Sequence, residues 1–177
     1  SLYEAITMPS SSINENSLSE VVGKHLLKRH ETISTAESCT AGKIAAWLAD
    51  IPGSSSYLLE GVIVYSNQSK TRLCGVPTQL IEECGAVSSQ VAIALAEGLR
   101  SRAKTDWTIS VTGIAGPGGG SLEKPVGTVH IACSGALGTK ERRFQFSGNR
   151  QEIREQSSEE ALLLLLESIL EVDRDSC

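Results

Sequence analysis

Apolar residues recur along this chain at two spacings, and segments of one spacing alternate with segments of the other. Strands that alternate with helices are typical of a layered α/β fold, so we expect a sandwich in which a mixed β-sheet is covered by helices on both faces. Intervals of three and four residues predict helices over 18–30, 42–49, 67–73, 77–84, 88–99 and 151–172. Short runs rich in β-branched and apolar residues predict strands over 32–36, 57–65, 107–114, 126–134 and 140–146.

Two of these strands are expected in different surroundings. Residues 107–114 contain no charged residue and are interpreted as a near-continuous apolar strand, which is typical of burial on both faces. Residues 140–146 alternate basic and apolar side chains, which indicates an edge strand. A serine hydroxyl can accept a hydrogen bond from a free N–H at a helix start. We therefore expect Ser17 or Ser19 to cap the first helix, and Ser88 and Ser89 to cap the long one.

The chain of 177 residues suits one domain with a sizeable core. Residues 1–16 are rich in serine and asparagine and predict a flexible N-terminal tail. Residues 17–177 contain no internal repeat and no linker, so we expect them to form a single domain.

Charge and composition exclude two classes of partner. The net charge is −5, which argues against a broad affinity for nucleic acid, and aromatic residues are only 4% of the chain, too few for a platform that stacks single strands. No apolar run approaches the roughly 20 residues of a membrane span, and the leucine run 162–166 is much shorter. We expect neither nucleic acid nor membrane as a partner.

The cysteines and histidines indicate neither a disulfide framework nor a metal site. There are five cysteines, an odd number, and no two of them have Cys-x-x-Cys spacing. The three histidines form no cluster of metal ligands. This pattern is typical of a protein of the reducing cytoplasm, and we expect no metal.

The segment Thr35-Ala-Glu-Ser-Cys-Thr-Ala-Gly42 joins a predicted strand to a predicted helix. A helix start presents free N–H groups and a partial positive charge, so such a turn can aim a nucleophile and bind an anion. Ser38 is the candidate nucleophile, and Cys39 is its neighbouring rival. The alternative is that Ser38 or Thr40 only caps the helix.

A second polar segment, Tyr65-Ser-Asn-Gln-Ser-Lys70, follows the next predicted strand. Ligands of open α/β sheets bind at the carboxyl ends of strands. Lys70 is therefore a candidate base if burial lowers its pKa, and Tyr65 is a candidate proton relay. The alternative is that Asn67 caps a helix and Lys70 lies in solvent.

Two further segments are candidate anion sites. The loop Val111-Thr-Gly-Ile-Ala-Gly-Pro-Gly-Gly-Gly120 follows a strand, and its N–H groups can approach a phosphate. It matches no Walker or dinucleotide fingerprint. Among the basic residues Arg142, Arg143 and Arg150, the last opens a predicted helix, where phosphate is favoured. A surface ion pair is the alternative role for such an arginine.

These segments, with Lys124-Pro-Val-Gly-Thr128 and Gly148-Asn-Arg-Gln-Glu-Ile-Arg154, resemble in order and sequence the CinA C-terminal domain family of nicotinamide mononucleotide deamidases. The resemblance covers roughly residues 18 to 172. It implies hydrolysis of the amide of nicotinamide mononucleotide to nicotinate mononucleotide and ammonia, in bacterial pyridine nucleotide salvage. The alternative is an inactive paralogue that binds pyridine nucleotides or has a regulatory role.

The resemblance also implies roles for single residues. Ser38 would be the nucleophile and Lys70 its base, with Tyr65 assisting and no cofactor. Ala41 stands where many members of the family have glycine, and a homodimer is suggested together with the apolar surface of the last helix. The implied substrate contacts are Glu37, Cys39, Thr40, Asn67, Thr112, Gly113, Gly116 and Arg150.

Overall fold

The computed structural model describes residues 15–175, and its side chains from residue 18 onward. The predicted tail, residues 1–16, lies outside the described residues except for its last two, which belong to a helix. The helices are α2 (Glu15–Arg29), α3 (Lys43–Ala49), α4 (Asn67–Cys74), α5 (Thr78–Cys84), α6 (Ser89–Ala103) and α7 (Arg150–Asp175), with a 3₁₀ turn at Ser54–Ser56. The strands are β1 (Ile33–Glu37), β2 (Leu58–Ile63), β3 (Trp107–Gly113), β4 (Thr128–Gly135) and β5 (Gly138–Gln145).

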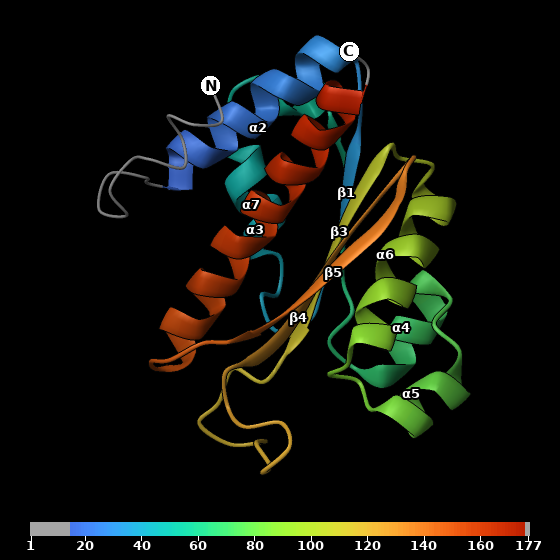
Figure 1. Ribbon diagram of the computed structural model, residues 1–177, viewed down its shortest axis with the longest axis vertical. Coiled ribbons are helices and arrows are strands. Elements are labelled where there is room, and N and C mark those ends of the chain that lie inside the picture. Colours follow the sequence, from blue (N-terminus) through green and yellow to red (C-terminus); the bar gives the residue numbers. More distant parts are fainter. Residues whose placement is uncertain (1–14, 176–177) are drawn as a thin grey trace.

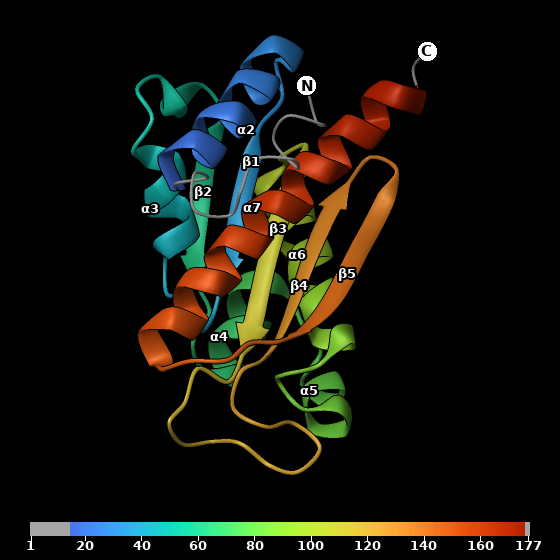
Figure 2. The same ribbon diagram turned by 60° about the vertical axis from the view of Figure 1, so that its left-hand side comes forward.

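The strands form one mixed five-stranded sheet in the order β2-β1-β3-β4-β5. Strand β1 pairs in parallel with β2 and β3, while β3–β4 and β4–β5 are antiparallel. Helices α2, α3 and α7 cover one face, and α4, α5 and α6 cover the other (Figure 1). The view in Figure 2 shows α7 crossing the sheet on the same side as α2 and α3. The predicted α/β sandwich is confirmed.

Burial along the strands follows their sequences. Strand β3 is buried from Trp107 to Thr112, and every residue of β4 is buried, because both strands lie between two helical layers. Strand β5 is mostly exposed or half-buried and forms an edge, as its basic residues predicted. Strand β2 is the other edge.

The serine caps were predicted with mixed success. Ser88 caps α6, because its hydroxyl accepts a hydrogen bond from the Val91 N–H. Ser19 lies inside α2, where its hydroxyl is buried without a partner among the described residues, so its predicted capping role is wrong. The first helix begins at Glu15, earlier than the apolar spacing indicated.

The leucine run near the end of the chain lies in the core. Leu162, Leu164 and Leu165 are fully buried in α7, which packs on β4, β3 and α2. The apolar surface of this helix is therefore occupied within the chain, and it gives no support to the expected homodimer. No helix in the part of the chain that the structure describes has the length and apolar character needed to cross a membrane.

The parallel strands bring three loops together. Because β1, β2 and β3 run in the same direction, the segments after Glu37, Ile63 and Gly113 leave the sheet at the same end, where the carboxyl ends of these strands lie. The first residue of α7, Arg150, also reaches this end of the sheet, since its side chain bonds Gly116 O. Each of the four segments carries candidate residues from the sequence.

Helix α6 packs closely on α4 at a glycine. A Cβ atom at Gly98 would lie 1.8 Å from the carbonyl oxygen of Cys74, the last residue of α4. We expect Gly98→Ala to lower the free energy of unfolding by about 1–3 kcal/mol or more, because this is the usual cost of overpacking. Urea unfolding checks this. Gly118→Ala is the matched control, because a Cβ there meets nothing within 4 Å, and equal midpoints for the two variants would contradict the prediction.

Candidate active site

The turn between β1 and α3 presents Ser38. Its backbone N–H donates to Val111 O at 3.0 Å, which extends the parallel pairing with β3 by one residue. The chain then reverses through two left-handed residues, Ala41 at φ +50° and Gly42 at φ +93°. A left-handed conformation strains any residue with a Cβ atom, which explains why glycine would suit position 41 in a turn of this kind.

A buried carboxylate holds this turn. Glu37 is 1% exposed. Its Oε1 accepts hydrogen bonds from Thr40 Oγ1 at 2.8 Å and Ile44 N at 2.9 Å, and its Oε2 accepts from Ala45 N at 3.0 Å. A negative charge at the N-terminus of a helix is also favoured by the helix dipole. Glu37 therefore caps α3 from the end of the strand, and the expectation that Ser38 or Thr40 caps it is wrong, since the N-cap Gly42 receives no side-chain bond.

Helix α4 delivers Lys70 to Ser38. Lys70 is 1% exposed, and its Nζ lies 3.4 Å from Ser38 Oγ. The same Nζ donates to Val64 O at 2.8 Å and Tyr65 O at 3.2 Å. The alternative of a solvated Lys70 is therefore wrong. The cap of α4 is Ser66, whose Oγ accepts from Ser69 N, so the expectation that Asn67 caps this helix is also wrong.

The surroundings of Lys70 favour the neutral amine. Burial lowers the pKa of Lys70, because the charged form loses its hydration. In the neutral form, two N–H groups can donate to the carbonyls of Val64 and Tyr65, which leaves the lone pair for Ser38 Oγ. A separation of 3.4 Å is long for a hydrogen bond, but such contacts commonly shorten when substrate binds.

The neighbouring thiol is a poor rival nucleophile. Cys39 is buried, and this burial raises its pKa to about 11. Arg154 and Arg150 lower the pKa in part, but less than burial raises it. With its pKa raised, Cys39 stays protonated near neutral pH. Since the thiolate is the reactive form of a cysteine, the protonated thiol is a poor nucleophile.

A pocket of about 270 Å³ opens beside Ser38. Arg150 stands at its rim and donates to Tyr65 Oη at 2.8 Å and to Gly116 O at 2.7 Å, so it joins the segment after β2 to the glycine-rich loop. The predicted site residues that line the pocket are Ser38, Cys39, Tyr65, Thr112, Gly113, Gly116 and Arg150. The structure thus brings together residues from the four segments.

Three predicted substrate contacts do not line this pocket. Glu37 and Thr40 are buried beneath the turn and bond each other. Asn67 is exposed and lines a different hollow with Thr71 and Ile81. The sequence motifs therefore contain two kinds of residue, those that hold the shape of the turn and those that line the pocket.

The arginines divide in the same way. Arg142 pairs with Glu167, and Arg143 donates to Glu123 O, so neither is among the residues lining the pocket. Arg150 does line it. Sequence analysis gave no role to Arg154, which donates from Nε to Cys39 O at 2.8 Å and from Nη2 to Thr40 O at 3.1 Å. Its spacing of four residues from Arg150, which puts both on one helix face, was the signal available for it.

Comparison with known proteins places this arrangement in a family. Residues 15–169 match the family model described as the CinA C-terminal domain. The chain belongs to the CinA C-terminal domain family. It is 51% identical over 158 residues to a CinA-like protein of Desulfotalea psychrophila, and 45% identical over 156 residues to a putative competence-damage inducible protein of Moorella thermoacetica. These matches cover 89% and 88% of this chain and 38% of each relative, so the chain spans little more than a third of their length.

Solved CinA-type structures have the same fold. The crystal structure of the competence/damage inducible protein CihA from Agrobacterium tumefaciens is 38% identical, with a TM-score of 0.84, and the match covers 86% of this chain and 93% of that one. The crystal structure of a competence or damage-inducible protein from Enterobacter asburiae is 30% identical, with a TM-score of 0.86 and coverage of 89% and 99%.

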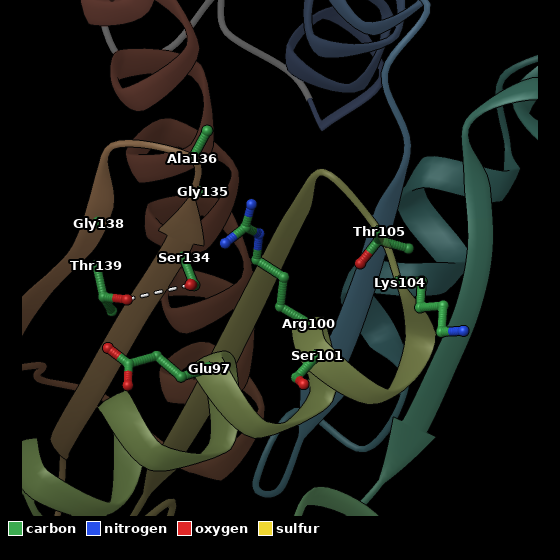
Figure 3. A pocket seen from close by; sticks show the side chains of 10 residues that line it. All are labelled: Glu97, Arg100, Ser101, Lys104, Thr105, Ser134, Gly135, Ala136, Gly138 and Thr139. Atoms are coloured by element: carbon green, nitrogen blue, oxygen red, sulfur yellow. Dashed lines mark hydrogen bonds between the residues drawn. The ribbon is translucent and has the colours of Figure 1, made fainter.

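A larger hollow, of about 610 Å³, lies between the C-terminal end of α6 and the β4–β5 hairpin of this CinA-type domain (Figure 3). Its polar groups largely bond within the chain: Ser134 Oγ bonds Thr139 Oγ1, Thr105 Oγ1 bonds Ser34 Oγ, and Arg100 Nε donates to Asp106 O. It contains no paired nucleophile and base comparable with Ser38 and Lys70. Among the described residues, no cluster of His, Cys, Asp and Glu could hold a metal ion.

The capping role of Glu37 can be tested by an isosteric change. Glu37→Gln puts an amide donor where the carboxylate accepts from N–H groups, and a buried donor left unpaired costs about 1–3 kcal/mol. We expect the free energy of unfolding to fall by that amount. Glu60→Gln, an exposed change on β2, is the control and should stay within about 0.5 kcal/mol of the parent. Similar losses in the two variants, measured by urea unfolding, would contradict the capping role.

Proposed function

We propose that this domain hydrolyses the amide of nicotinamide mononucleotide to nicotinate mononucleotide and ammonia. The observation that carries the proposal is the contact of 3.4 Å between Lys70 Nζ and Ser38 Oγ. It joins a hydroxyl at a strand–helix turn to an amine whose pKa is lowered by burial. Such a pair suits acyl transfer from an amide, a poor electrophile that needs an activated nucleophile.

The first half of the reaction forms an acyl-enzyme. Ser38 Oγ attacks the amide carbon while its proton passes to Lys70 Nζ, and the carbonyl oxygen becomes an oxyanion. Free backbone N–H groups of the turn stabilise this charge. The tetrahedral intermediate then collapses, the C–N bond breaks, and Lys70 returns its proton to the nitrogen, which leaves as ammonia.

The second half regenerates the enzyme. Water attacks the ester carbon, and Lys70 takes one of its protons. Ser38 Oγ then leaves and recovers a proton from Lys70, and the carboxylic acid product loses its remaining proton to water and departs as a carboxylate. The roles of Ser38 and Lys70 are the same in both halves, so a single base is sufficient.

Arg150 is the proposed partner for the substrate phosphate. It is the arginine of the pocket rim, it lies at the first turn of α7, and its guanidinium still has N–H groups beyond those bonded to Tyr65 and Gly116. Planar guanidinium groups bind phosphate oxygens in pairs. Tyr65 would assist by holding Arg150 in this position.

A binder without catalysis is the second candidate, because the relatives are named CinA-like or competence-damage inducible proteins and not amidases. That candidate would keep the pocket but lose the geometry between nucleophile and base, so the Ser38–Lys70 contact favours the enzyme.

The four described cysteines are free thiols, which is consistent with the proposed cytoplasmic setting.

Ser38→Ala should abolish the release of ammonia from nicotinamide mononucleotide. Loss of the nucleophile removes the covalent route, and we expect kcat to fall on the order of 10³-fold or more. An enzyme-coupled ammonia assay measures this, and calorimetry on Ser38→Ala checks that substrate still binds.

Cys39→Ala is the matched control, because the buried thiol is protonated and should be dispensable for chemistry. Turnover retained by Ser38→Ala and lost in Cys39→Ala would reverse the assignment of the nucleophile. Binding without turnover in the parent protein would favour the second candidate.

The pH dependence should report Lys70. Because burial lowers its pKa, the amine loses its proton at a lower pH than an ordinary lysine. It can accept the Ser38 proton only in this neutral form, so kcat/KM should fall as the pH drops through the lowered pKa and level off above it. Lys70→Arg, which stays charged, should be inactive throughout. A flat profile of the parent from about pH 5 to about 9 would exclude a lysine base.

A further inference from the structure

Two walls of the pocket beside Ser38 come from segments that are far apart in the sequence. One wall consists of residues from the β3–β4 loop, residues 114–127. The other consists of Ala86 and Val87, which lie in the short segment that joins α5 to α6. The width of the pocket between them therefore depends on what holds this segment to the loop.

Two side chains bond carbonyl groups at the wall of Ala86 and Val87. Thr112 Oγ1, at the end of β3, donates to Ala86 O at 2.8 Å, and Lys124 Nζ, from the β3–β4 loop, donates to Cys84 O at 2.8 Å. Cys84 is the last residue of α5, and carbonyls at a helix end have no partner within the helix, so a lysine is favoured there. In the part of the chain that the structure describes, Lys124 is the only residue of the loop with a hydrogen bond to residues 84–88.

Lys124 is itself held in a tight turn of the loop. Ser121 N donates to Lys124 O at 2.9 Å, and Lys124 N donates to Ser121 Oγ at 3.0 Å. The preceding carbonyl, Glu123 O, accepts from Arg143 of β5 at 3.0 Å. A Cβ atom at Gly85 would lie 3.0 Å from Lys124 Nζ, so the amine passes close to the residue that follows α5. The turn thus presents its lysine to the wall, while Arg143 ties the same turn to the sheet.

We propose that Lys124 is a positioning residue, which holds the wall of Ala86 and Val87 against the β3–β4 loop and so sets the width of the pocket for its substrate. Lys124 is not among the residues that line the pocket, so it acts through the residues that it holds. The inference deepens the proposed function and rests on it for the identity of the substrate. It gives a role to the motif Lys124-Pro-Val-Gly-Thr128, which the proposed chemistry leaves unused.

The first test compares substrate affinity with turnover. Lys124→Met removes the amine and keeps most of the side-chain volume. With nicotinamide mononucleotide we expect KM to rise roughly 10-fold and kcat to stay within about twofold, because a wall that only shapes the pocket contributes equally to binding of the substrate and of the transition state. Calorimetry in the Ser38→Ala background should show a similar rise in Kd. Lys124→Arg, which keeps a donor, should restore most of the affinity.

Arg143→Met is the matched control. Arg143 bonds the neighbouring carbonyl of the same turn but comes from β5 and not from the wall. Its KM should therefore stay within about twofold of that of the parent. Equal KM values for Lys124→Met and Arg143→Met would overturn the inference, since the bond to the wall would then have no effect of its own.

The second test needs no substrate. Thermolysin cuts before large apolar residues, and Leu122 is fully exposed in the turn that contains Lys124. Because exposed loops are cut when they open locally, we expect Lys124→Met to be cut before Leu122 roughly 10-fold faster than the parent. Lys124→Arg should be cut at nearly the rate of the parent.

The two tests separate the inference from the proposed function. Equal cleavage of Lys124→Met and the parent would overturn the inference alone. Faster cleavage of Lys124→Met, in a protein whose parent releases no ammonia from nicotinamide mononucleotide, would overturn the proposed substrate and keep the role of Lys124 at the wall.

Discussion

The site depends on an amino group that has been taken out of water. An exposed lysine stays protonated and cannot take a proton from a serine, whereas Lys70 is buried and has its pKa lowered by the loss of hydration. Two carbonyls at the end of β2 give the amine acceptors for its own hydrogens. The remaining direction is toward Ser38. The parallel β1–β2 pair makes this possible, because both strands deliver their following residues to one edge.

The turn that presents Ser38 is held by opposite charges from two directions. Glu37 accepts hydrogen bonds from the N–H groups that open α3, and Arg154 donates to the carbonyls that precede them. The Glu37 carboxylate thus bonds the N–H groups and the Arg154 guanidinium bonds the carbonyl groups of a segment that contains the left-handed residue Ala41. Backbone strain at a functional turn persists only where the surroundings determine it, and here two half-buried or buried ionic groups do so.

Much of the fold was predictable, because the strands and helices have strong local patterns. The edge position of β5 followed from its basic residues, and the burial of β3 from its apolar ones. Ser38 and Lys70 were found through the ends of two strands. The errors share one cause, because Ser19, Asn67 and the supposed caps Ser38 and Thr40 were assigned from residue type alone. Ser66 takes the role expected of Asn67, Glu37 caps α3 in place of Ser38 or Thr40, and Ser19 lies inside α2. Arg154 was missed because its contact joins residues 115 positions apart.

Ser38 and Lys70 reach each other from separate helical layers, α4 on one face of the sheet and the α3–α7 side on the other. A small loosening of either layer changes their separation while the five strands stay paired. Such local openings require less free energy than global unfolding. Warming should therefore end the proposed hydrolysis before the sheet melts, so the thermal tolerance of that activity would be set by how firmly the outer helices stay docked, more than by the core between them.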